Sequence, residues 1–260
     1  MLTAITRKVS PALGRCALQF LERQEIDIVK ATAQHEHYEA CLVDLGLNVV
    51  SLPAEPDLPD SMFVEDPAVV VNEVAVIARM GNQDRRPESP TLAEALARFR
   101  PLRHMREPAT LEGGDVLRAG RTFFVGLSSR TNQAGIAQLA SELEPYGYTV
   151  SSVEVRRCLH LKSAACYLGN NTILANRDWT DTAPFRDYRI VDVAPGEPAA
   201  ANILPIGDTV LMAAAFPDTA AIVRQLGYKV RTLDISELQK AEAALTCSSL
   251  IFEVPATPAS

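Results

Sequence analysis

Basic residues are in short supply in this chain of 260 residues. It has 25 lysines and arginines against 32 aspartates and glutamates, a formal net charge of −7 at pH 7. No lysine- or arginine-rich block stands out, so we expect no nucleic-acid partner. No apolar run is long enough to cross a bilayer. The first eight residues also lack the pattern of a secretory signal, and we expect no membrane partner.

Cysteine and histidine are scarce as well. The five cysteines are odd in number, widely scattered and free of any C-x-x-C pair or zinc-finger spacing. Such a pattern favours reduced thiols in a cytoplasmic protein over disulfides or a structural metal site. Hydrophobic residues make up 47% and charged residues 22%, which is typical of a globular protein with a sizeable core. No linker-like or low-complexity tract divides the chain, so we predict one domain over residues 1–260.

Two short patterns recur along the chain and give the strongest indication of its architecture. In the first, a helix-like segment ends at a glycine and a β-branched apolar run follows, at Gly46, Gly147 and Gly227. Glycine suits the left-handed residue after a helix, and the run after it suits a strand.

The second pattern is a pair of apolar runs around a polar or glycine turn, typical of a β-hairpin. Its copies lie at residues 69–77, 116–125, 166–174 and 203–212. Amphipathic helices are expected at 132–143 and 218–226, beginning near Thr131 and Thr219. The terminal runs 2–6 and 248–252 could pair and complete a fifth unit. We predict an α/β fold of about five ββα-like units around an axis, because a doubly wound open sheet would connect its strands mainly through helices.

Candidate nucleophiles begin with the thiols. An isolated cysteine is more often a small buried hydrophobe than a nucleophile, and we interpret Cys16, Cys41, Cys158 and Cys166 in that way. Cys247 differs, because its neighbours Thr-Cys-Ser-Ser are polar and directly precede the last predicted strand. Such a junction can display a side chain at the mouth of a ring of units.

One histidine is a candidate acid or base. His160 lies in the apolar, strand-like run 158–162, where a hydrogen-bonded core histidine is an equal alternative. His35 and His37, in the helical stretch 32–45, face different sides and make a poor metal pair, with at least one expected in solvent. His104 lies among arginines and is expected to be exposed.

Carboxylates and arginines complete the candidate set. Glu112 stands in Leu-Glu-Gly-Gly-Asp, although a tight turn would explain those glycines equally well. Glu65 and Asp66 precede a proline, and at a strand end both could converge on a guanidinium, with a solvated turn as the alternative. Arg85 and Arg130 each follow a predicted hairpin and precede a helix. They could bind the carboxylate of an amino acid, although an arginine taken alone is more often a surface charge.

Six segments in order resemble the dimethylarginine dimethylaminohydrolase family of guanidine-modifying enzymes. They are 58–67, 111–116, 125–132, 159–163, 200–202 and 245–249. The resemblance runs across nearly the whole chain and implies a five-bladed α/β propeller.

The resemblance also implies site roles. Cys247 would be the nucleophile, His160 the general acid and base, and Glu112 the residue that orients the imidazole. The implied substrate contacts are Asp66 and Glu65 for the guanidinium, Arg85 and Arg130 for the carboxylate, and Asp60 with the backbones of Leu18 and Ala241 for the amino-acid end.

The implied reaction is hydrolysis of Nω-methylated arginines to citrulline and a methylamine through a covalent thiouronium on cysteine. We expect a small guanidinium amino acid as the partner and no metal or organic cofactor, although a thiolate beside an imidazole could capture inhibitory zinc. Residues 10–24 are the candidate lid. The oligomeric state stays open, with a homodimer among the options. The alternatives are another guanidine-modifying enzyme, such as an arginine deiminase or an amidinotransferase, and a non-catalytic propeller-fold binding protein.

Overall fold

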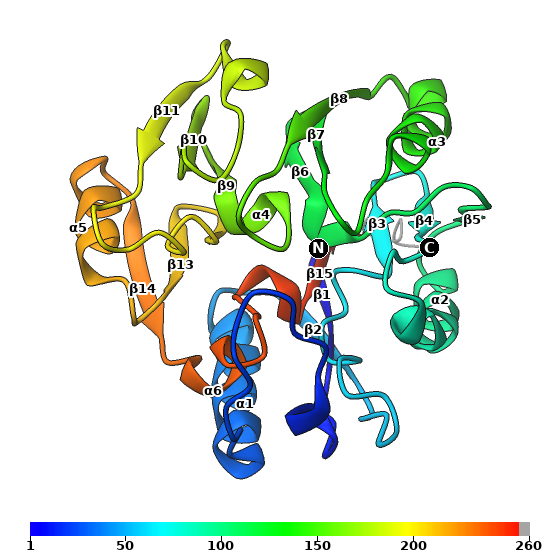
Figure 1. The fold of residues 1–260 in the computed structure, drawn as a ribbon, viewed down its shortest axis with the longest axis horizontal. Coiled ribbons are helices and arrows are strands. Elements are labelled where there is room, and N and C mark those ends of the chain that lie inside the picture. The colour runs from blue at the N-terminus through cyan, green and yellow to red at the C-terminus, as the bar shows by residue number, and fades with distance from the viewer. Residues whose placement is uncertain (255–260) are drawn as a thin grey trace, which may run out of the picture.

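Five three-stranded sheets form the β-structure of the computed structural model, which describes residues 1–254. Figure 1 shows the sheets as blades arranged in a ring around a common centre, with the longer helices on the outside. The prediction of about five units around an axis is therefore confirmed.

The first unit combines both ends of the described chain. It contains β1 (Leu2–Arg7), α1 (Ile28–Asp44), β2 (Asn48–Leu52) and β15 (Leu250–Glu253). β1 pairs with β15 in antiparallel register, with Leu2 opposite Glu253, and with β2 in parallel. The predicted pairing of the terminal strands is confirmed, and it closes the ring.

The other four units each contribute a hairpin and a third strand. The second contains β3 (Ala68–Val70), β4 (Ala75–Ile77), α2 (Ser89–Ala97) and β5 (Leu102–His104). The third contains β6 (Val116–Ala119), β7 (Thr122–Leu127), α3 (Gln133–Leu143) and β8 (Thr149–Glu154). The fourth contains β9 (Ala165–Gly169), β10 (Thr172–Ala175) and β11 (Arg189–Asp192), and α4 (Leu161–Ala164) precedes it. The fifth contains β12 (Leu204–Ile206), β13 (Thr209–Ala213), α5 (Pro217–Gln225) and β14 (Lys229–Leu233), and α6 (Ser236–Gln239) follows it.

The two recurring sequence patterns are halves of one unit. The hairpin strands pair antiparallel, and the strand after the crossover pairs in parallel with the second hairpin strand, as β7 does with β8. The glycines before the third strands have the expected left-handed backbone, with φ of 85° at Gly46, 76° at Gly147 and 93° at Gly227. Each unit is therefore ββαβ, except that a short 3-10 turn replaces the crossover helix between β10 and β11.

Helix starts follow their caps. The helix predicted at 32–45 begins earlier, at Ile28, because the Asp27 side chain accepts a hydrogen bond from the Lys30 N–H at 3.0 Å. The cap of α3 is Asn132, whose Oδ1 accepts from the Gly135 N–H at 2.7 Å. Thr131, which we expected near that start, does not cap the helix. Its hydroxyl instead accepts a hydrogen bond from the Glu112 N–H in the site described below.

The apolar core is divided among the blades and does not fill the centre. Five separate hydrophobic clusters lie within and between neighbouring units, one of them built around Phe124 and Phe185 with ring centroids 4.8 Å apart. The centre of the ring can therefore hold charged groups contributed by different units. No helix in residues 1–254 is long and apolar enough to span a membrane.

Candidate active site

One cavity collects most of the residues that the sequence singled out. Its walls come from segments spread between residues 17 and 247, and include Asp60, Asp66, Arg85, Arg130, His160, Ala241 and Cys247. A ring of units brings these segments together because each contributes the loop at its inner end. Cys247 is partly exposed there, whereas the other four cysteines are buried as predicted.

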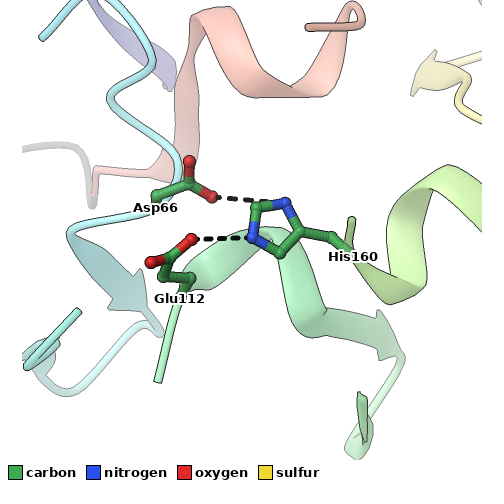
Figure 2. Close-up of side chains that lie close together, drawn as sticks. All are labelled: Asp66, Glu112 and His160. Atoms are coloured by element: carbon green, nitrogen blue, oxygen red, sulfur yellow. Dashed lines mark hydrogen bonds and ion pairs between the residues drawn. The ribbon is translucent and has the colours of Figure 1, made fainter. Parts of the chain in front are cut away.

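The imidazole of His160 lies between two carboxylates, which approach its two ring nitrogens (Figure 2). Its Nε2 is 2.8 Å from Oε2 of Glu112, and its Nδ1 is 3.9 Å from Oδ1 of Asp66. Burial lowers the pKa of His160, but the charge of Asp66 and the hydrogen bond with Glu112 outweigh it and raise the pKa to about 9. The ring is therefore an imidazolium at neutral pH and can serve as an acid.

Glu112 is fully buried and held from several directions. Its backbone N–H donates to Oγ1 of Thr131 at 3.1 Å, its Oε1 accepts from the N–H of Asn82 at 3.1 Å, and Nη1 of Arg130 lies 3.3 Å from both carboxylate oxygens. Burial raises the pKa of Glu112, but the hydrogen bond and charge of His160 prevail and lower the pKa to about 2. The carboxylate is thus a fixed anion beside the imidazole.

His160 reaches the cavity from a turn. The predicted strand-like run at 158–162 is wrong, because α4 begins at Leu161 with His160 as its extended N-cap residue. The Leu161 N–H donates to Oδ1 of Asp115 at 2.9 Å, where a strand would pair with a neighbouring strand. The Ser163 N–H donates to the His160 carbonyl at 3.0 Å and closes the turn.

The two glycines after Glu112 allow backbone and ring to approach closely. A Cβ on Gly114 would lie 2.5 Å from Nδ1 of His160, and a Cβ on Gly113 would lie 2.0 Å from the Glu65 carbonyl. The Gly114 N–H also donates to Oδ1 of Asp66 at 3.0 Å. Both positions therefore require glycine for space, since neither has a positive φ.

Cys247 lies in the 3-10 turn Thr246–Ser248, directly before β15. Burial, followed by the charges of Glu65 and Asp66, raises the pKa of its thiol. In the substrate-free protein the sulfur is therefore a thiol, and a bound cation would favour the thiolate.

Glu65 and Asp66 face different cavities, although the sequence led us to expect both on one ligand. Glu65 forms an ion pair with Lys162, and its Oε2 accepts from Oγ1 of Thr246 at 2.8 Å. Thr246 in turn exchanges hydrogen bonds with the Asn202 amide. Glu65 and Lys162 line a second cavity, whereas Asp66 lines the cavity that contains His160 and Cys247. Glu65 is thus a buried residue that contacts the turn of Cys247 through the Thr246 hydroxyl.

Both predicted arginines line the cavity that contains His160 and Cys247. Nη1 of Arg85 lies 2.6 Å from Oδ2 of Asp66, and two other nitrogens of Arg85 contact Glu88 at 2.9 and 3.0 Å. Arg130 pairs with Glu112, as described above. Each arginine stands between a predicted hairpin and a helix, as expected, and each already has a carboxylate partner.

The implied contacts at the amino-acid end are partly assembled. Asp60 and Ala241 line the cavity, and Ala17 lines it where the resemblance points to the backbone of Leu18. Oδ2 of Asp60 accepts from the Ala17 N–H at 3.1 Å, which ties the candidate lid to the cavity wall.

Three donor groups in the cavity also satisfy the spacing of a metal site. Ligand atoms of Asp66, Glu112 and His160 lie within 4.8 Å of one another. Both carboxylates, however, are already paired with the arginine cations described above. The set therefore fits the task of holding a charged imidazole better than that of binding an ion.

A family model described as "N,N dimethylarginine dimethylhydrolase, eukaryotic" matches residues 17–187. The chain belongs to the dimethylarginine dimethylaminohydrolase family. The N(G),N(G)-dimethylarginine dimethylaminohydrolase of Streptomyces coelicolor is 39% identical over 248 residues, which cover 95% of each chain. That of Pseudomonas aeruginosa is 35% identical over 228 residues, covering 87% of this chain and 90% of the relative.

A solved structure also matches closely. It is a cysteine-to-serine mutant of the Pseudomonas aeruginosa dimethylarginine dimethylaminohydrolase in complex with citrulline, with a TM-score of 0.92 and 33% identity over 97% of this chain and 100% of that one. The predicted family and the predicted propeller fold are confirmed.

The structure adds several residues that the sequence did not single out for this dimethylarginine dimethylaminohydrolase family member. These residues form hydrogen bonds or ion pairs with the predicted site residues or with their immediate neighbours. They are Asp115, Glu88, Thr131, Lys162 and Asn202. Most lie within or next to the segments that carry the resemblance, so their position in the sequence could have indicated that they belong to the site. Their individual contacts depend on which units meet at the centre.

Proposed function

We propose that Cys247, His160 and Glu112 carry out the hydrolysis of Nω-methylated arginines, as nucleophile, general acid and base, and orienting carboxylate. The chain is a hydrolase of the dimethylargininase type, which releases citrulline and a methylamine. The observation that carries the assignment of roles is the single cavity that joins the thiol to a carboxylate-flanked imidazole.

The charges in the cavity match the first step of this reaction. In the substrate-free protein His160 is protonated and the sulfur is a thiol, so the pair is not yet reactive. A guanidinium bound against Asp66 would place a positive charge near the sulfur and favour loss of the thiol proton to solvent. Substrate binding would then generate the nucleophile only when a target is present.

The covalent steps follow from these protonation states. The thiolate attacks the central guanidinium carbon and forms the C–S bond of a tetrahedral adduct. The C–N bond to the methylated nitrogen breaks, and His160 gives its proton to the departing amine. The remaining thiouronium is attacked by water, from which the now neutral imidazole takes a proton. The C–S bond then breaks while the second proton of that water passes to solvent, which releases citrulline and restores the thiolate.

The rest of the cavity would hold the amino acid. Arg85 and Arg130 would share the α-carboxylate through charge-assisted hydrogen bonds, and Asp60 with nearby backbone groups would meet the ammonium. Glu65 would act on the guanidinium through its charge, and Lys162 moderates that charge. The chain would work as a single catalytic domain, because its units share one cavity. The five free cysteines support a cytoplasmic location.

The test compares dimethylarginine, monomethylarginine, arginine and agmatine as substrates for release of a citrulline-type product. We expect turnover of the methylated arginines and little of the other two. The Cys247→Ser variant should lose turnover by at least about a thousandfold while still binding substrate in calorimetry. Cys41→Ser, a buried cysteine in α1, is the matched control and should keep turnover.

Mass spectrometry of acid-quenched enzyme gives the second arm. A substrate-derived adduct on Cys247 is expected during turnover. Turnover of arginine in preference to dimethylarginine would contradict the substrate assignment. Full activity of Cys247→Ser would contradict the assignment of Cys247 as the nucleophile.

A further inference from the structure

Glu242 lines the catalytic cavity but has no role in the chemistry above. It lies just after α6, where its N–H donates to the Gln239 carbonyl at 3.1 Å and the Ala243 N–H donates to the Leu238 carbonyl at 3.2 Å. Its φ of 57° is left-handed, which is uncommon for a residue other than glycine or asparagine. This turn ends the helix and sets the direction of the Glu242 side chain.

The carboxylate of Glu242 binds the backbone of the candidate lid, residues 10–24. Its Oε1 accepts hydrogen bonds from the N–H groups of Gln19 at 2.9 Å, Phe20 at 2.5 Å and Leu21 at 2.6 Å. Three successive N–H groups that converge on one oxygen form an anion-binding nest. The side chains of Phe20 and Leu21 are exposed, so this carboxylate supplies much of what fixes that part of the lid.

The lid is fixed on its other side by a second unit. Oε1 of Gln19 accepts from Nε of Arg130 at 3.3 Å, and the Gln19 amide also exchanges hydrogen bonds with Ser129. The lid therefore runs across the cavity from Glu242, after α6, to Arg130, before α3. Together with the Ala17 N–H, which donates to Asp60, these contacts join the lid to the cavity wall at three places.

The second oxygen of Glu242 is unused. Its Oε2 is buried and has no hydrogen-bond partner among residues 1–254. A buried carboxylate oxygen without a donor is unfavourable, and few such atoms persist in folded proteins. The same cavity is also lined by Asp60 and Ala241, the residues proposed above for the ammonium end of the substrate. A bound α-ammonium would supply the missing donor.

We propose that Glu242 is a positioning and specificity-determining residue that couples lid closure to recognition of the substrate's α-ammonium. One oxygen holds the lid backbone, and the other accepts an N–H of the ammonium. The inference rests on the proposed function for its substrate. It predicts that guanidino acids without an amino group bind under a closed lid but lose one interaction.

The test pairs two substrates with three variants. Dimethylarginine is compared with its des-amino analogue, 5-(dimethylguanidino)pentanoate, followed as a substrate or, without turnover, as a competitive inhibitor. The variants are Glu242→Gln, Glu242→Ala and the control Glu22→Gln. Glu22 is an exposed lid acid with no side-chain hydrogen bond or ion pair to the described residues, so the control removes the same charge without removing a contact.

The glutamine side chain keeps an oxygen for the lid but loses the charge. Glu242→Gln should therefore lower kcat/KM for dimethylarginine about tenfold, through KM, and change the affinity for the analogue less than twofold. Glu242→Ala should weaken both ligands about tenfold or more, because it also releases the lid. Equal losses on both ligands in Glu242→Gln, or no loss on either, would overturn the ammonium contact.

A second readout follows the lid without any turnover. The rate at which a neutral alkylating reagent modifies Cys247 in substrate-free protein is measured by peptide mass spectrometry. It should rise about tenfold in Glu242→Ala and stay within twofold in Glu242→Gln and Glu22→Gln. An unchanged rate in Glu242→Ala would overturn the lid contact. If the wild type hydrolyses neither methylated substrate, the proposed function fails, yet this rate still tests the lid.

Discussion

The substitution Glu112→Gln tests the central electrostatic claim with little change in shape. It removes the charge that contacts Nε2 of His160 at 2.8 Å and leaves an amide of the same size. Glu112 is one of the groups that hold this pKa up against burial, and Asp66 remains in the variant, so we expect the His160 pKa to fall from about 9 toward its ordinary value. If it returns to about 6.5, the imidazolium fraction at pH 7.5 drops from about 97% to about 10%.

The assay is an NMR pH titration of the imidazole carbons in substrate-free protein. The chain has only four histidines, and a His160→Asn sample assigns the signal of interest. The pH dependence of kcat/KM should shift in the same direction, with a loss of activity above pH 7 where the acid form is depleted. A His160 midpoint in Glu112→Gln within about 0.3 units of the wild-type value would refute the reasoning, since 0.3 units is only about 0.4 kcal/mol.

The same pair makes a stability prediction. A histidine whose folded pKa is raised contributes stability that is fully present below its unfolded pKa and is lost as the pH rises through its folded pKa. The window for His160 therefore runs from about pH 6.5 to about pH 9. Chemical unfolding across this window should show a decline of up to about 3 kcal/mol in the wild type and a flatter curve in Glu112→Gln. Parallel curves would contradict the coupling.

Two further substitutions test the packing around the site. Gly114→Ala should cost about a hundredfold in kcat, because the added Cβ displaces the imidazole of His160, the proposed acid and base, while Gly14→Ala, where the Cβ meets no atom within 4 Å, should leave kcat unchanged. Steady-state kinetics on both variants checks this, and similar kcat values would contradict it. Lys162→Met leaves the buried carboxylate of Glu65 without its cation, so urea unfolding should report a loss of about 3–5 kcal/mol. The exposed Lys229→Met is the control and should unfold like the wild type; a Lys162→Met variant as stable as this control would show that the ion pair is dispensable.

Local sequence was enough for the repeating unit. A glycine after a helix, a β-branched run and a hairpin turn each depend on a few neighbouring residues, and these patterns placed the units near their observed positions. Boundaries were less secure, because a cap such as Asp27 decides where a helix begins. The prediction of a strand around His160 was wrong for a related reason. The Leu161 N–H, which a strand would pair with a neighbouring strand, donates to the Asp115 side chain from another unit.

The residue types of the site could also be found in the sequence, because a thiol, an imidazole and carboxylates in ordered motifs suggest their chemistry. The direction in which each side chain points could not be found in the sequence. Glu65 and Asp66 are adjacent in the sequence but have different partners. Glu65 contacts Lys162 and Thr246. Asp66 contacts Arg85 and the Gly114 N–H. Glu242 likewise gained its lid contacts only where the fifth unit meets the loop after β1.

The amino-acid order by itself determined the number of units, the closure of the ring by its two ends and the chemical groups available at the centre. Tertiary structure alone decided which of those groups meet and in what charge state. The physical reason is that pKa values and hydrogen-bond partners depend on distance and burial, and the residues that set them lie up to 223 positions apart along the chain.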